Sequence, residues 1–201
     1  MLERRSALSD ALVKGGRDGS SDGRRLSLGE VRGWSLVQVA AFASSLTELE
    51  AAVGAALGIA GLPGEIGKDM EAGDRRILKT GPEQFWILGP ANDSLAARLQ
   101  ESVPAAMGAV TPLSHSRTRI FIEGEAAREV LAKGIPLDFH PAIFRIGQFA
   151  LTGLHHTPVL VHRVSQSRYE IYAMRTFALS VWEWLTDAAL PFGYDIEMAL
   201  L

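Results

Sequence analysis

The sequence predicts an α+β protein of two small α/β sub-domains, each a mixed or antiparallel sheet with flanking helices. Short runs rich in β-branched and aromatic residues alternate with segments whose apolar residues recur at helical spacing. The two halves also repeat one order of elements (strand, helix, two or three antiparallel strands, helix), which indicates an internal duplication. We therefore expect a lead-in over residues 1–24, a first sub-domain over 25–108 and a second over 109–201.

The lead-in is rich in glycine and polar residues. Residues 14–24 contain four glycines among charged residues and serines. Such a segment cannot bury enough apolar surface to offset the entropy that it loses on ordering. We therefore expect the lead-in to be flexible.

The first half predicts extended segments where β-branched and aromatic residues cluster, and helices where apolar residues lie three and four positions apart. Gly81-Pro82 predicts a turn between two strands. Ser44 or Ser45 offers an N-cap to the first helix, which Gly58 ends. The expected extended segments cover 26–30, 34–42, 76–80 and 84–88, and the expected helices cover 46–57 and the run from Asn92 or Asp93 to about 103.

The second half repeats this order. A strand over 117–123 leads into a short helix over 125–133, which Gly134 ends. Three extended segments and a last helix follow, over 147–154, 158–164, 169–174 and about 176–190.

The last expected helix is the most unusual element. Its apolar residues form an arc wider than the ~100° that is typical of a surface helix. Two interpretations are open: the helix lies deep in the core of its own domain, or one of its edges contacts another polypeptide. The residues of this candidate partner interface are Trp184, Phe177 and Leu179.

Composition excludes several classes of site and partner. The formal net charge of −3 disfavours a nucleic-acid partner, which usually requires a basic surface. The absence of cysteine excludes disulfides, thiolate zinc sites, iron–sulfur clusters and cysteine nucleophiles. No apolar run is long enough to span a membrane and no signal-peptide core is visible, so we expect a cytoplasmic protein without a membrane partner.

No motif predicts a catalytic, cofactor-binding or metal-binding residue. The loop over 61–68 resembles a phosphate-binding loop but lacks its first glycine and its hydroxyl residue. His156 and His162 share a strand face but lie about 20 Å apart in an extended chain, too far for one metal ion. Arg117 and Arg119 share the polar face of a strand, where they grip an anion or partner carboxylates or, more simply, lie in solvent.

Residues 110–138 resemble the central signature of the sarcosine oxidase gamma subunits. They read Val-Thr-Pro-Leu-Ser-His-Ser-Arg-Thr-Arg-Ile-Phe-Ile-Glu-Gly from 110 to 124 and Gly-Ile-Pro-Leu-Asp from 134 to 138. The similarity covers roughly residues 34–194 and includes Phe139-His-Pro, Phe144, Gly147, Tyr169-Glu-Ile-Tyr, Arg175 and the helix over 177–185. This family is related to the folate-binding half of the glycine-cleavage aminomethyltransferase (the T-protein), whose turn the Pro136-Leu-Asp138 segment resembles.

The resemblance implies a T-protein-like folate-binding-domain fold and a place inside a larger enzyme. That heterotetrameric flavoprotein demethylates sarcosine to glycine and forms hydrogen peroxide and, with tetrahydrofolate, methylenetetrahydrofolate. Its FAD, FMN, NAD and tetrahydrofolate belong to the larger subunits, so the resemblance implies alpha, beta and delta subunits as partners and no catalytic activity for the isolated chain. The signature positions, which we assign to turn geometry and packing, are Ser114, His115, Arg117, Gly124 and Asp138.

Two other functions remain open. One is a stand-alone folate-binding aminomethyltransferase-like protein, although a T-protein adds a β-barrel domain for which we expect no room in 201 residues. The other is the small subunit of a related N-methyl amine dehydrogenase. What the chain contributes to a complex, and whether it binds folate itself, are also open.

Overall fold

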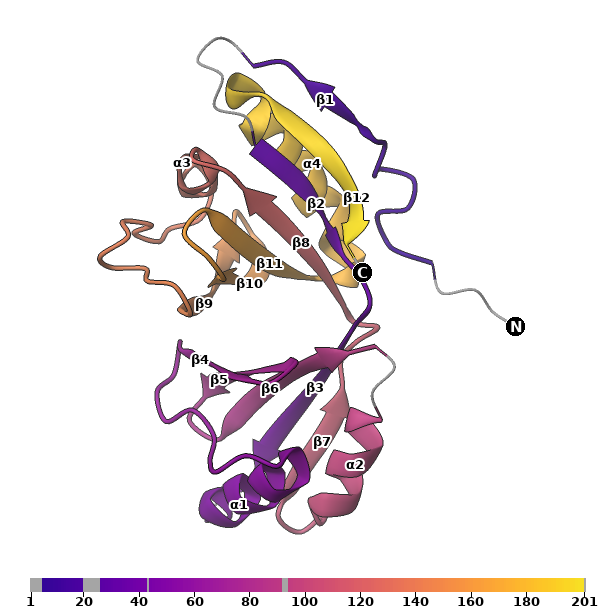
Figure 1. The fold of residues 1–201 in the computed structure, drawn as a ribbon, viewed down its shortest axis with the longest axis vertical. Helices are drawn as coiled ribbons and strands as arrows, with labels where there is room; N and C mark the ends of the chain where they lie inside the picture. The colour runs from indigo at the N-terminus through magenta and orange to yellow at the C-terminus, as the bar shows by residue number, and fades with distance from the viewer. Residues whose placement is uncertain (1–4, 20–25, 43, 92–93, 201) are drawn as a thin grey trace. The chain divides into compact units, whose positions relative to one another are not determined.

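The computed structural model describes residues 5–19, 26–42, 44–91 and 94–200. Contacts divide the chain into two compact units (Figure 1). Unit 1 combines Met1–Arg32 with Ser116–Leu201, and unit 2 is Gly33–His115. Within the described residues each unit consists of one β-sheet and two α-helices, which confirms the predicted α+β class.

Unit 2 is an antiparallel sheet with its helices on one face (Figure 1). Its elements are β3 (Trp34–Ala41), α1 (Leu46–Leu57), β4 (Asp69–Ala72), β5 (Arg75–Gly81), β6 (Gln84–Pro90), α2 (Leu95–Ser102) and β7 (Gly108–Pro112). The strand order is β4-β5-β6-β3-β7. Leu49 and Val53 of α1 and Leu99 of α2 pack on Val39 and Phe85 of the sheet, and their burial holds the helices there.

Unit 1 is a mixed sheet, again with its two α-helices on one face (Figure 1). Its strands are β1 (Gly15–Arg17), β2 (Leu26–Val31), β8 (Arg117–Glu123), β9 (Phe149–Leu154), β10 (Thr157–Arg163), β11 (Arg168–Met174) and β12 (Tyr194–Leu200). Its helices are α3 (Ala127–Ala132) and α4 (Ala178–Ala189), with short 3₁₀ turns η1 (Arg175–Phe177) and η2 (Leu190–Phe192) on either side of α4. The strand order is β1-β12-β2-β8-β11-β10-β9, in which only the β12–β2 pair among the described strands is parallel.

The two units share a strand order, in agreement with the predicted repeat of elements. β4-β5-β6-β3 of unit 2 corresponds to β9-β10-β11-β8 of unit 1, with the first helix after β3 or β8 and the second after β6 or β11. The units differ in the next place of the sheet. β7, which follows the second helix, occupies it in unit 2, whereas β2 occupies it in unit 1 and β12 lies one place further out.

The first helix follows the predicted bounds because its ends are encoded locally. Its apolar residues recur at helical spacing over 46–57, and Ser45 is its N-cap residue, although the serine side chain accepts no capping hydrogen bond. Gly58 adopts a left-handed conformation with φ of 69°, which glycine enters without strain and which ends the helix. The expected cap of the second helix at Asn92 or Asp93 lies outside the described residues, and α2 begins after Ser94.

The observed units differ from the expected contiguous halves. β2 belongs to unit 1 because it pairs antiparallel with β8, where Leu28 lies opposite Ile122 in the shared core. At the other boundary β7 pairs with β3, so unit 2 continues to His115 rather than ending at residue 108. Both differences arise from pairing between strands that are distant in sequence, which local patterns do not encode.

The expectation of a flexible lead-in is wrong for much of its described part. Leu8 and Leu12 lie in the core of unit 1, and β1 pairs with β12. The Ser6 hydroxyl donates to the buried Glu30 carboxylate, 2.6 Å from Oε2, and Arg32 Nε donates to the same oxygen at 2.9 Å. Residues 5–12 therefore close one end of the core. Residues 1–4 and 20–24 of the expected lead-in lie outside the described residues.

Candidate functional site

Helix α4 buries the apolar stripe that its spacing predicts. The buried residues of the helix are Ala178, Val181, Trp182, Leu185 and Ala189. Their burial against the sheet anchors α4 to unit 1. The helix therefore belongs first to its own core.

Trp184 lies at the edge of this core and is partly buried. Its ring packs over Gly134, where an added Cβ would lie 2.4 Å from Trp184 Cζ2. The His155 ring makes an edge contact with it at a centroid distance of 5.7 Å. These contacts assign most of Trp184 to intramolecular packing.

Two other residues of the candidate partner interface are well exposed. Phe177 ends η1 with 42% of its surface exposed, and Leu179 in the first turn of α4 is 48% exposed. Met174, at the end of β11, is also exposed. Contiguous exposed apolar surface marks sites that contact a partner, and these three residues are candidates for such a surface.

A second exposed apolar group escaped the sequence reasoning. It consists of Ile143 and Ile146, in the loop before β9, and Leu151 on β9, all of them more than half exposed. β9 is an edge strand of its sheet, and the Leu151 side chain on it is exposed to solvent. The signal in the sequence was a pair of isoleucines three residues apart in a segment without helical periodicity.

The signature residues serve local geometry. The Leu36 N–H donates to Ser114 Oγ at 2.9 Å, which ties the end of unit 2 to β3. His115 is exposed, and Arg117 donates to the carbonyl and hydroxyl of Ser116. Partial burial lowers the pKa of Arg117.

Gly124 and Asp138 lie in turns. Gly124 has φ of 134°, a conformation that favours glycine, and its N–H donates to the Ser167 carbonyl at 3.0 Å. Asp138 Oδ1 accepts the His140 N–H at 2.8 Å in a turn typical of aspartate.

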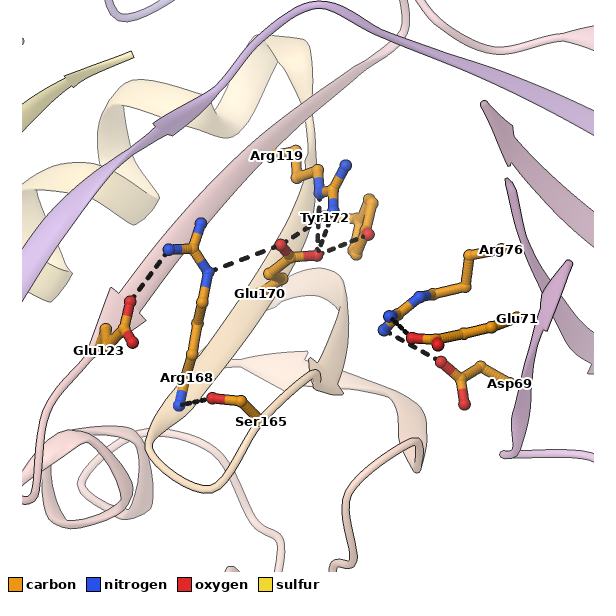
Figure 2. Close-up of polar contacts among 9 residues, drawn as sticks. All are labelled: Asp69, Glu71, Arg76, Arg119, Glu123, Ser165, Arg168, Glu170 and Tyr172. Carbon is orange, nitrogen blue, oxygen red and sulfur yellow. Dashed lines mark hydrogen bonds and ion pairs between the residues drawn. The ribbon is translucent and has the colours of Figure 1, made fainter. Parts of the chain in front are cut away.

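An ion-pair network links β8 and β11 in unit 1 (Figure 2). Arg119 grips Glu170 with two bonds, from Nε to Oε2 at 2.8 Å and from Nη2 to Oε1 at 2.9 Å. Tyr172 donates its hydroxyl to Glu170 Oε2 at 2.9 Å. Arg168 lies between Glu123, at 3.0 Å, and Glu170, at 3.8 Å.

The network corrects the simpler interpretation of Arg119 as a solvated residue. Its side chain is only 18% exposed and that of Glu170 only 4%. Burial alone would lower the pKa of Arg119, but Tyr172 and Glu170 beside it hold the pKa above its usual value. The alternation of the strand predicted that Arg119 lies on a polar face. It could not identify the partner carboxylate, which lies 51 residues away in the sequence.

The polar groups of the network are engaged with one another. The Glu170 carboxylate accepts hydrogen bonds from both Arg119 and Tyr172. Unit 2 carries a smaller cluster of the same kind, in which Arg76 pairs with Asp69, at 3.1 Å, and with Glu71 (Figure 2). We interpret both clusters as structural.

Over the described ranges, no group of three or more His, Cys, Asp or Glu residues is placed to hold a metal ion. His156 is exposed, whereas His162 is buried on β10 with its ring edge-on to Phe149. Of the described helices, none is both long enough and apolar enough to cross a membrane.

Comparison with known proteins reveals close relatives. Residues 39–190 match the sarcosine oxidase, gamma subunit family. The sarcosine oxidase subunit gamma of Corynebacterium sp. (strain U-96) is 34% identical over 146 residues, which cover 71% of this chain and 70% of that protein. The subunit gamma of Corynebacterium sp. (strain P-1) is 29% identical, and the match covers 94% of this chain and 89% of that one.

Two solved structures agree with this assignment. One chain of the heterotetrameric sarcosine oxidase from Corynebacterium sp. U-96, in complex with pyrrole 2-carboxylate, matches with a TM-score of 0.81 and 29% identity, covering 94% of this chain and 96% of that one. Aminomethyltransferase T of the glycine cleavage system from Bartonella henselae shares the fold, with a TM-score of 0.62 at 17% identity over 88% of this chain and 48% of that one. The predicted T-protein-like fold is confirmed, and the chain belongs to the sarcosine oxidase gamma subunit family.

Proposed function

We propose that the chain is the non-catalytic gamma subunit of a heterotetrameric sarcosine oxidase. The observation that carries this proposal is the TM-score of 0.81, over 94% of the chain, to a chain of such a complex. The charged clusters of both units support a non-catalytic role, because their groups are engaged with one another.

In this proposal the chemistry belongs to the larger subunits. The alpha, beta and delta subunits are the partners, and they hold FAD, FMN, NAD and tetrahydrofolate. The complex converts sarcosine to glycine and forms hydrogen peroxide and methylenetetrahydrofolate, and the gamma chain is a folded partner that stabilises the assembly. We also place this complex in the cytoplasm.

The partner surface in this proposal includes Phe177 and Leu179. Each is roughly half exposed, so burying the exposed remainder contributes about half of the ~1.5–3 kcal/mol that full burial of such a side chain gives. Phe177 immediately precedes α4, and Leu179 lies in its first turn. The opposite face of the helix is anchored in the core. An exposed apolar side chain held beside an anchored helix can pack into the apolar core of an interface.

Reconstitution tests the proposal. The purified chain alone, the other three subunits without it and the complete set would each be assayed for sarcosine-dependent peroxide formation and for tetrahydrofolate binding. We expect activity in the complete set and none in the chain alone. Methylene transfer or tight folate binding by the isolated chain would instead assign it to the aminomethyltransferase-like class. Activity with a different N-methylated amine, and none with sarcosine, would assign the complex to the related dehydrogenases.

A second set of variants tests the surface. Phe177→Glu and Leu179→Glu should each weaken assembly, measured by size-exclusion chromatography, while the melting temperature of the chain stays unchanged. Val13→Glu is the matched control because Val13 is an exposed apolar residue of the same unit. Assembly of both variants as complete as that of the control would remove these residues from the interface.

A further inference from the structure

Unit 1 contains a cavity of about 580 Å³ that the function proposed above does not use. It lies beside the connection between β8 and α3 and the turn between β10 and β11, and Pro141 also lines it. Its polar lining includes Arg128, Arg163, Ser167 and Tyr169. The volume falls in the range of small-molecule sites.

Arg163 is a buried cation at the inner wall of this cavity. It is 5% exposed, and its guanidinium donates to the carbonyls of Phe144 at 2.7 Å, Gln166 at 2.9 Å and Ser165 at 3.3 Å. These acceptors are neutral, and within the described residues no carboxylate pairs with Arg163. A guanidinium has five N–H groups, and a buried charge without a counter-ion is costly. The site therefore favours an anion.

Tyr169 adds a hydroxyl to the same cavity. Edge contact with Phe139 and stacking with Phe144 hold its ring, and the residue is only 2% exposed. No described residue forms a hydrogen bond with its hydroxyl. Burial raises the pKa of Tyr169, and Arg163 and Arg128 oppose that rise, so both guanidinium groups act on the phenol. A protonated phenol can donate to an anion.

The outer wall of the cavity sets the charge of the ligand. Arg128 is exposed, and it forms no ion pair within the described part of the chain. Glu125 is exposed at the same wall and repels a second negative charge. The cavity thus combines two guanidinium groups and a phenol with a nearby carboxylate. This set suits one planar, singly charged anion better than a phosphate.

We propose that this cavity binds a carboxylate group, which Arg163 and Tyr169 hold from inside and Arg128 holds from outside. The carboxylate comes either from a small organic acid or from an acidic residue of a partner subunit. The proposal does not depend on the identity of the complex, because it concerns groups of unit 1 alone.

Calorimetric titration of the full chain with benzoate tests this site, with benzamide as the neutral probe of the same shape. We expect saturable one-site binding of benzoate and at least about tenfold weaker binding of benzamide. Arg128→Gln should weaken benzoate binding by at least about tenfold and Tyr169→Phe by about fivefold. Arg17→Gln is the matched control, because it removes an exposed arginine of the same unit away from the cavity.

Arg128 is exposed and Tyr169→Phe keeps the ring, so both variants should fold, which circular dichroism checks. Absence of saturable benzoate binding, equal binding of benzamide, or benzoate affinity unchanged in Arg128→Gln would each overturn the proposal. Titration of the assembled complex then separates the sources of the carboxylate. A benzoate site that is present with the wild-type chain and lost with Arg128→Gln identifies a small-molecule site. If the isolated chain binds benzoate but neither the wild-type nor the Arg128→Gln complex does, a carboxylate of a partner subunit occupies the site.

Discussion

Removal of the Glu170 carboxylate should strongly destabilise unit 1. In Glu170→Ala, Arg119 keeps a charge on a side chain that is 18% exposed, and the Tyr172 hydroxyl loses its acceptor. Breaking one side of a buried ion pair costs about 3–5 kcal/mol. For a urea dependence of about 2–3 kcal/mol per molar, the unfolding midpoint should fall by about 1–2.5 M. Tryptophan fluorescence and circular dichroism of the purified chain would measure it.

Two comparisons isolate the burial of the charge. Glu123→Ala breaks the other bond of Arg168, but the Glu123 side chain is 41% exposed, so the loss should stay below about 1 kcal/mol. The double variant Arg119→Met with Glu170→Leu removes both charges and should recover most of the stability lost in Glu170→Ala. A loss in Glu170→Ala no larger than that in Glu123→Ala would refute the reasoning.

Three further predictions concern packing and titration. Gly134→Ala places a Cβ 2.4 Å from Trp184 Cζ2 and should destabilise the chain by about 1–3 kcal/mol in thermal unfolding; an unchanged melting temperature would show that the ring moves aside freely. Leu8→Ala should cost about 2–5 kcal/mol in urea unfolding. Val13→Ala, at an exposed position, should change stability by less than about 0.5 kcal/mol, and equal effects of the two would contradict the burial of the amino-terminal segment. Because burial raises the pKa of Tyr169 above its ordinary value of 10.0, the folded chain keeps that proton to a higher pH than the unfolded chain does. This contribution to stability is therefore complete below pH 10 and lost as the pH rises above it, and Tyr169→Phe should flatten the alkaline loss of stability.

Local patterns predicted the elements whose ends are encoded in neighbouring residues. β8 covers the predicted residues 117–123, because apolar and polar side chains alternate along it with one face in the core. α1 follows its prediction because Gly58 ends it. In such elements burial and turn chemistry agree, so one sequence suffices to find them.

Other features depend on pairing between distant segments. β7 was missed because it is a largely exposed edge strand that ends in Pro112, and such a strand shows no alternation of burial. β12 follows η2 and pairs in parallel with β2, more than 160 residues earlier in the chain. The Arg119–Glu170 pair also required the strand register, which sets Tyr172 opposite Arg119 and Glu170 diagonally beside it.

Isolation of the chain from cells that contain the alpha, beta and delta subunits tests the central claim most directly. An affinity tag on this chain should recover a stoichiometric complex with a flavin absorbance spectrum that forms peroxide from sarcosine. The same tag should recover an inactive chain without flavin when the other subunits are absent. Recovery of the chain alone from cells that contain all four subunits, while the other three form an active enzyme without it, would contradict the account.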